Sequence, residues 1–117
     1  MAKKAMETLS ETMFYTLMAL NTGEQCGTEI AAWVKRHTRD RIGMGPGTLY
    51  TILGNFQSEG LIEKRREEGR RITYGITEKG RTVYAAELER LRLCLRDAAL
   101  AEGDAHHETD DLAAAAL

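Results

Sequence analysis

The stretch IGMGPGTLYTILGNFQSEGLIE, residues 42–63, holds the start and the end of one predicted helix. Its apolar residues recur at the i, i+3, i+4 and i+7 spacing of a buried helical stripe. They are Leu49, Ile52, Leu53 and Phe56. Pro46 suits the first turn of a helix, where its missing N–H has no partner to lose, and Gly60 suits the left-handed residue after a helix. The stretch therefore predicts a helix that begins near Pro46 and ends before Gly60.

Gly43, Gly45 and Gly47 stand at the start of this helix. Backbone N–H groups at such a start can bind an anion, so a nucleotide phosphate and a DNA phosphate are both candidates. A nucleotide-binding loop needs a preceding strand and a Walker or GxGxxG pattern. The chain has neither pattern here, and no lysine stands at the start of the helix. DNA phosphate is therefore the favoured anion.

The face opposite the buried stripe is small, polar and uncharged. It consists of Gly47, Thr51, Asn55 and Ser58, flanked by Thr48 and Tyr50. A face of this composition is either simply solvated or available to contact bases. Asn55 can pair with adenine through two hydrogen bonds, which is worth about 1 to 3 kcal/mol of discrimination if it reaches a base edge.

Two helices are predicted before this stretch. Thr8 and Glu11 have the spacing of a capping box, and an apolar helical repeat follows them. A second helix is predicted over residues 28–38. Trp33 is adjacent to the buried face of that helix, so we expect it in the core or in an interface.

A basic hairpin is predicted after the stretch. Two short strands, residues 61–66 and 71–76, flank a turn at Gly69. The hairpin carries five cations, namely Lys64, Arg65, Arg66, Arg70 and Arg71. Such a cluster is either solvated or a site of attraction for phosphate.

A last helix is predicted to follow a cap at Thr77 and to end near Glu102. Its apolar repeat consists of Tyr84, Leu88, Leu91 and Leu95. A single exposed helix should not carry this much apolar surface, so the repeat is predicted to form a dimer interface. The segment 103–117 has no core-forming pattern before its alanines and is predicted to be an acidic, disordered tail.

Composition limits the class of the protein. Its 117 residues, 43% hydrophobic and 29% charged, predict one globular domain. The net charge of -2 hides an asymmetry, because residues 1–81 hold 13 basic against 10 acidic side chains, and residues 82–117 hold 3 against 8. No run reaches the roughly 18 apolar residues of a membrane helix, and the N-terminal residues lack the pattern of a secretion signal. We therefore expect a cytoplasmic location and no membrane partner.

No catalytic, metal or cofactor site is predicted. Cys26 and Cys94 lack the spacing of a zinc site or a disulfide framework. His37 lies in a helix of mixed charge, and the pair His106 and His107 lies in the acidic tail, where solvation is a better explanation than a metal site. No histidine stands near a candidate nucleophile, so an enzyme is the weakest of the classes and we expect a binding protein.

The predicted order is helix, helix, helix, two-stranded hairpin, long helix. This order is typical of a winged helix-turn-helix domain with an added helix, and the predicted fold class is mainly α with a small β hairpin, α+β. In such a domain the third helix enters the DNA major groove while the hairpin reaches toward the flanking backbone.

The segment GPGTLYTILGNFQSEGLIE, with the basic hairpin and YGITEKGR after it, resembles the PadR family of bacterial transcriptional regulators. The likeness covers roughly residues 9–95, and the single short C-terminal helix is similar to the smaller subfamily. The resemblance implies a winged helix-turn-helix over residues 1–80 and a dimerisation helix over residues 81–102. It also implies a homodimeric repressor whose partner is double-stranded DNA with a pseudo-palindromic operator, released by a small-molecule effector.

The resemblance assigns roles to individual residues. It matches the recognition helix and the basic wing at Thr48, Tyr50, Thr51, Arg70 and Arg71, and it places Asn55 on the face toward the bases. Family members commonly carry basic residues where this chain has Gly54 with Asn55, and again where it has Gly75. A second hypothesis therefore stands beside the first, a winged-helix dimer that has lost DNA binding and acts as a protein-interaction or ligand-sensing module.

An effector pocket is implied by the same resemblance, since some members bind flat drugs and others respond to phenolic acids. The last helix here has no tryptophan, which disfavours a drug held between paired tryptophans of that helix. Phe14, Met18 and Trp33 are the residues expected to line a pocket from the domain side.

Overall fold

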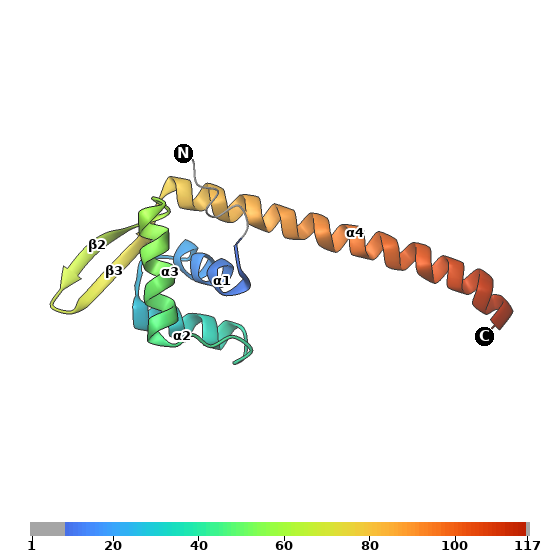
Figure 1. The fold of residues 1–117 in the computed structure, drawn as a ribbon, viewed down its shortest axis with the longest axis horizontal. Coiled ribbons are helices and arrows are strands. Elements are labelled where there is room, and N and C mark those ends of the chain that lie inside the picture. Colours follow the sequence, from blue (N-terminus) through green and yellow to red (C-terminus); the bar gives the residue numbers. More distant parts are fainter. Residues whose placement is uncertain (1–8, 117) are drawn as a thin grey trace. The chain divides into compact units, whose positions relative to one another are not determined.

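The computed structural model describes residues 9–116, with side chains through Asp104. The elements are α1 (Glu11–Asn21), β1 (Gln25–Cys26), α2 (Gly27–His37), α3 (Pro46–Ser58), β2 (Ile62–Glu68), β3 (Arg71–Ile76) and α4 (Glu78–Ala116) (Figure 1). This order confirms the α+β class and the winged helix-turn-helix arrangement. It also adds the short strand β1, which the sequence pattern did not predict.

The chain forms two compact units that divide between Glu87 and Leu88. The first unit contains α1 to α3, the sheet and the first turns of α4, and the second contains the rest of α4. The predicted division at residues 80 and 102 stays a prediction. Within the first unit, Figure 1 shows the three helices gathered beside the base of the hairpin, whose turn projects beyond them.

The last helix is longer than expected. Its backbone stays helical to Ala116, whereas the prediction ended it near Glu102. Alanine favours helix, and a single glycine such as Gly103 inside a helix costs only about 1 kcal/mol, so neither residue type forces an end. A separate acidic tail over residues 103–117 remains a prediction. No helix in the described part of the chain is long and apolar enough to cross a membrane.

The three strands form one antiparallel sheet in the order β1-β3-β2. β3 is the central strand, and the last four of its residues are buried. A two-stranded ribbon alone is marginal in water, so the pairing of Cys26 with Thr73 supports the hairpin and attaches it to the start of α2. The hairpin turns at Gly69, whose φ of 62° lies in the left-handed region that favours glycine.

The first helix begins at a serine cap. The Ser10 hydroxyl accepts a 3.1 Å hydrogen bond from the Met13 N–H, and α1 starts at Glu11. This bond satisfies one of the N–H groups that have no partner within the helix. The predicted capping box involved Thr8, which lies outside the described residues.

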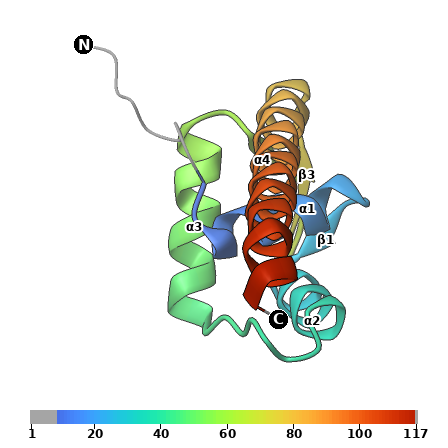
Figure 2. The same cartoon turned by 90° about the vertical axis from the view of Figure 1, so that its right-hand side faces the viewer.

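The third helix has the predicted ends and the predicted buried stripe. Gly45 is its extended N-cap, Pro46 occupies its first turn, and Gly60 follows it with a φ of 76°. The buried residues of α3 are Leu49, Ile52, Leu53 and Phe56. They join a core whose fully buried members include Leu17, Leu20, Ile30 and Val34. Figure 2 shows the loop from α2 leading into the lower end of α3.

Candidate nucleic-acid interface

The outer face of α3 is exposed, as the stripe predicts. Thr48, Thr51 and Asn55 are exposed, and the Tyr50 side chain is 64% exposed even though it is a large aromatic residue. The Thr51 hydroxyl donates to the Gly47 carbonyl at 3.0 Å, which leaves its oxygen free to accept a further hydrogen bond. The buried stripe on the other side of the helix fixes this orientation.

A groove lies between α3, the hairpin and the start of α2. Its volume is about 290 Å³. It is lined by Cys26, Gly27, Thr28, Tyr50, Arg70, Arg71, Ile72 and Tyr74. Three of the predicted DNA contacts, Tyr50, Arg70 and Arg71, therefore meet in one groove although they lie on different elements. Thr48, Thr51 and Asn55 do not line it.

Sequence reasoning missed the walls of this groove. Thr28 enters it because α2 begins beside the hairpin, and Tyr74 enters it through the register of the central strand. Tyr74 is buried, and burial, with smaller effects from Tyr50 and Glu67, raises the pKa of its hydroxyl. The phenol therefore stays neutral at physiological pH. In the sequence, Ile72, Tyr74 and Ile76 alternate as in a half-buried strand, which predicts that this tyrosine faces inward but not which helix it contacts.

Arg71 is held by an acidic partner. Its guanidinium Nη2 lies 3.0 Å from a carboxylate oxygen of Glu29 in the first turn of α2. The Glu29 carboxylate also accepts a 2.9 Å hydrogen bond from the Cys26 N–H. The pKa of Glu29 lies below its ordinary value of 4.5. The largest cause is that backbone hydrogen bond, followed by a hydrogen bond with the Cys26 side chain and by the positive charge of Arg71. The carboxylate is therefore ionised at neutral pH and opposes the positive charge of Arg71.

Arg70 differs from its neighbour. It follows Gly69 in the turn, it is exposed, and it forms no ion pair with any side chain in the described part of the chain. Lys64 on β2 is likewise exposed and without an acidic partner among the described side chains. An unpaired surface cation can approach a phosphate without first breaking another contact, so these two residues are the most available cations of the hairpin.

The residues predicted to line an effector pocket are not brought together. The Phe14 ring stacks on Tyr84 with centroids 5.3 Å apart, and Met18 is half-buried in α1. Trp33 stacks on His37 with centroids 3.8 Å apart and borders a hollow that neither Phe14 nor Met18 lines. The effector pocket stays a prediction.

The residues predicted to form a dimer interface differ in exposure. Tyr84 is half-buried and already in contact with Phe14 of its own chain. Leu88 and Leu91 are half-buried, whereas the Leu95 side chain is 71% exposed. The stripe therefore ends in open apolar surface, and its role in a dimer stays a prediction.

Groups that could bind a metal ion do not cluster in the part of the chain whose side chains are described. Within the described residues, no three histidine, cysteine, aspartate or glutamate side chains are placed to hold a metal ion. His37 forms a 2.9 Å hydrogen bond between its ring Nδ1 and the Trp33 carbonyl. The side chains of His106 and His107 lie outside the described part of the structure.

A family model described as the transcriptional regulator PadR-like family matches residues 16–86, more than half of the chain. A transcriptional regulator from Clostridium thermocellum is 27% identical with a TM-score of 0.65, and the match covers 72% of this chain and 85% of that one. RosR of H. salinarum, in the complex hsRosR-S1, is 25% identical with a TM-score of 0.65 over 91% of this chain and 94% of that one.

A more distant structure includes DNA. Bacillus subtilis PadR in complex with operator DNA is 22% identical with a TM-score of 0.60, over 68% of this chain and 48% of that one. At this identity the likeness shows the fold alone. No curated protein sequence matches the chain.

Proposed function

Because the chain belongs to the PadR-like family of transcriptional regulators, we propose that it binds double-stranded DNA as a homodimer and represses transcription. In this proposal, α3 of each protomer enters the major groove of one half of a pseudo-palindromic operator, and the hairpin reaches the flanking backbone. The solved complex of Bacillus subtilis PadR with operator DNA has the same fold.

The observation that carries the proposal is the meeting of Tyr50, Arg70 and Arg71 in one groove. A hydroxyl and two guanidinium groups are suitable donors to phosphate oxygens. Because Tyr50 is on α3 and the arginines are on the hairpin, a DNA backbone in this groove contacts both elements at once. The adjacent exposed face of α3 then presents Thr51 and Asn55 to the bases, with Thr48 near the backbone at the start of the helix.

The remaining parts of the proposal concern assembly and control. The exposed Leu95 favours a partner along the stripe that begins at Tyr84 and includes Leu88 and Leu91. In this proposal a small-molecule effector releases the operator. Phe14, Met18 and Trp33 are the candidate contacts of the effector, but neither Phe14 nor Met18 lines the hollow that Trp33 borders. Transcriptional regulation places the protein in the cytoplasm, where the DNA of a bacterial cell lies.

Fluorescence anisotropy with the promoter of the protein's own gene tests the proposal. Wild type is titrated at low and at moderate salt, beside Tyr50→Ala and the double variant Arg70→Gln/Arg71→Gln. Lys35→Gln is the control, because it removes an exposed positive charge outside the groove. We expect both groove variants to bind all sequences more weakly and the double variant to lose part of the salt dependence. Wild-type binding by both groove variants would show that the face is wrongly assigned.

Two features favour the alternative, a winged-helix dimer that has lost DNA binding. The helix α3, residues 46–58, contains no lysine or arginine. Three hairpin arginines, Arg65, Arg66 and Arg71, are already paired with carboxylates. The absence of binding at every salt concentration, together with a stable dimer in sedimentation, would support this protein-interaction or ligand-sensing module.

A further inference from the structure

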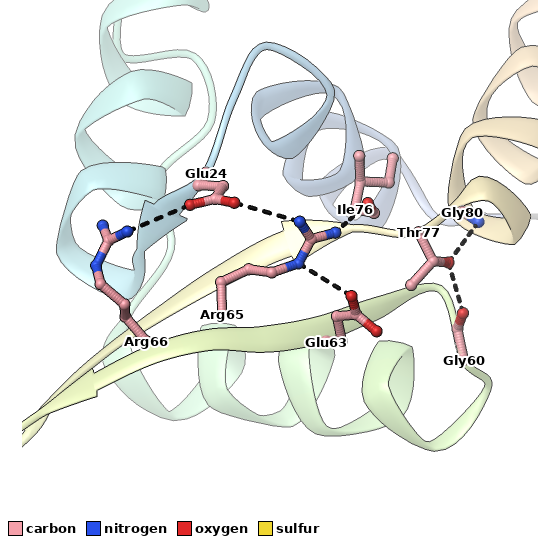
Figure 3. Close-up of polar contacts among 8 residues, drawn as sticks. All are labelled: Glu24, Gly60, Glu63, Arg65, Arg66, Ile76, Thr77 and Gly80. Atoms are coloured by element: carbon pink, nitrogen blue, oxygen red, sulfur yellow. Dashed lines mark hydrogen bonds and ion pairs between the residues drawn. The ribbon is translucent and has the colours of Figure 1, made fainter.

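The Arg65 side chain lies across β3 and points toward Glu24 and Ile76 (Figure 3). It lies directly over Gly75. A Cβ atom added to Gly75 would stand 2.6 Å from Cζ and 2.7 Å from Nε of Arg65. The guanidinium therefore occupies the space that any other side chain at position 75 would need. A positive charge does stand at this position of the wing, but it comes from the neighbouring strand.

A bulge in β2 gives Arg65 this position. Lys64 pairs with Tyr74 and Arg66 pairs with Thr73, so the register shifts between them and Arg65 has no Cα partner. A β-bulge of this kind commonly re-aims the side chain of the extra residue. Here the side chain turns from the edge strand toward the centre of the sheet.

Each nitrogen of the Arg65 guanidinium has a partner. Nη1 lies 3.2 Å from Glu24, Nε lies 3.1 Å from Glu63, and Nη2 donates a 3.0 Å hydrogen bond to the Ile76 carbonyl. The Arg65 side chain is only 33% exposed. Its donors are therefore used within the protein, and a DNA phosphate would have to displace a carboxylate to reach them.

The carboxylates of Glu63 and Glu24 lie at the two opposite edges of the sheet. Glu63 on β2 pairs with Gly75, and Gln25 on β1 pairs with Tyr74. Extending the β1 register by one residue places Glu24 opposite Gly75 as well. Arg65 therefore reaches from β2 across the central strand β3 to the residue that precedes β1. Glu24 also holds Arg66 at 3.5 Å.

We propose that Arg65 is a positioning residue, which together with Glu24 clamps the hairpin at a fixed angle to the helix-turn-helix and requires Gly75 beneath it. This inference rests on the proposed function. The clamp acts through other residues, since it holds Arg70 and Arg71 where they share a groove with Tyr50. The hairpin cations then divide into clamp residues and phosphate contacts, and Arg70 belongs to the second group.

DNA binding distinguishes the two groups. Arg65→Lys keeps the positive charge but replaces the planar guanidinium with an ammonium group. Gly75→Ala moves the guanidinium away from its partners without changing the net charge of the protein. We expect both variants to weaken operator binding by about threefold to tenfold, the effect of one or two lost hydrogen bonds, with an unchanged slope of log Kd against log salt. Arg70→Gln, the reference for a phosphate contact, should reduce that slope by about 0.9. The clamp would be overturned if Arg65→Lys and Gly75→Ala reduced the slope as much as Arg70→Gln does. Wild-type affinity in both variants would overturn it as well.

Amide hydrogen exchange tests the clamp without DNA. In Arg65→Lys and in Gly75→Ala, residues 62–76 should exchange faster than in wild type, while α1 should keep its protection because its core contacts are unchanged. Unchanged exchange in the hairpin would disprove the clamp even if the protein binds its operator. Faster exchange in a protein that binds no DNA would instead retain the clamp and reject the proposed function.

Discussion

Thr77 joins the end of α3 to the start of α4, because its hydroxyl donates a 2.7 Å hydrogen bond to the carbonyl of Gly60 (Figure 3). The same oxygen accepts a 3.0 Å hydrogen bond from the Gly80 N–H, so Thr77 is the cap that its sequence position predicts. One side chain thereby fixes the end of α3 relative to the start of α4.

Thr77→Ala should destabilise the protein by about 1 to 2 kcal/mol, because it removes a cap and leaves the Gly60 carbonyl without this donor. Urea unfolding measures the change. Thr82→Ala is a matched control in the same helix, since Thr82 is exposed and only bonds back to the Glu78 carbonyl at 3.1 Å. Equal losses in the two variants would contradict a capping role for Thr77.

Gly80→Ala should destabilise the protein more than Thr77→Ala does. A Cβ at position 80 would run into the backbone carbonyl of Leu61 and would stand 2.7 Å from Cγ1 of Ile76. Backbone cannot move aside as a flexible side chain can, so we expect a loss of about 2 kcal/mol or more. Gly103→Ala in the same helix meets nothing within 4 Å and should instead stabilise it by up to about 1 kcal/mol. Thermal unfolding compares the two variants, and a stable Gly80→Ala protein would refute the close contact.

Features encoded within a few residues could be predicted. The stripe of α3, the left-handed Gly60 and the Thr77 cap each depend on spacing within one or two helical turns. The strand β1 was missed because two residues, Gln25 and Cys26, are too short to show any periodicity.

Contacts between distant residues could not be predicted from the pattern. Arg65 with Glu24 and Arg71 with Glu29 are 41 and 42 residues apart. These ion pairs form because the register of β3 brings the hairpin beside the start of α2. The sequence alone does not distinguish the paired cations of the hairpin from the unpaired ones. The groove walls depend on the same register.

Arg70→Gln should weaken DNA binding more than Arg71→Gln does. Arg70 has no acidic partner among the described side chains, whereas Arg71 forms a 3.0 Å ion pair with Glu29 that partly neutralises its charge. We expect Arg70→Gln to lower the slope of log Kd against log salt by about 0.9 and Arg71→Gln to lower it by less. Anisotropy titrations at several salt concentrations provide both slopes. The opposite ranking would mean that the Glu29 pair opens on binding.

The stability of the protein should fall as acid protonates Glu29. Its pKa is lowered in the folded protein, so its contribution is fully present above the ordinary value of 4.5 and is lost as the pH falls through the folded pKa. Glu29→Gln should therefore reduce the difference in urea midpoint between pH 7 and a pH below 4.5. Glu68→Gln, which changes the same charge on the exposed hairpin, is the control. An identical pH dependence in wild type and Glu29→Gln would rule out this role.

Gly54→Lys should strengthen DNA binding, because it adds a cation to the exposed face of the proposed recognition helix. A Cβ at position 54 meets nothing within 4 Å, and lysine favours helix over glycine by roughly 0.5 to 1 kcal/mol, so the variant should fold at least as stably. If the new ammonium reaches a phosphate, the slope of log Kd against log salt steepens by about 0.9. Gly54→Gln provides the same gain in helix propensity without the charge, so the difference between the two variants isolates the electrostatic effect. Identical affinity and salt dependence in Gly54→Lys and Gly54→Gln would place this face of α3 away from DNA and would favour the interaction module.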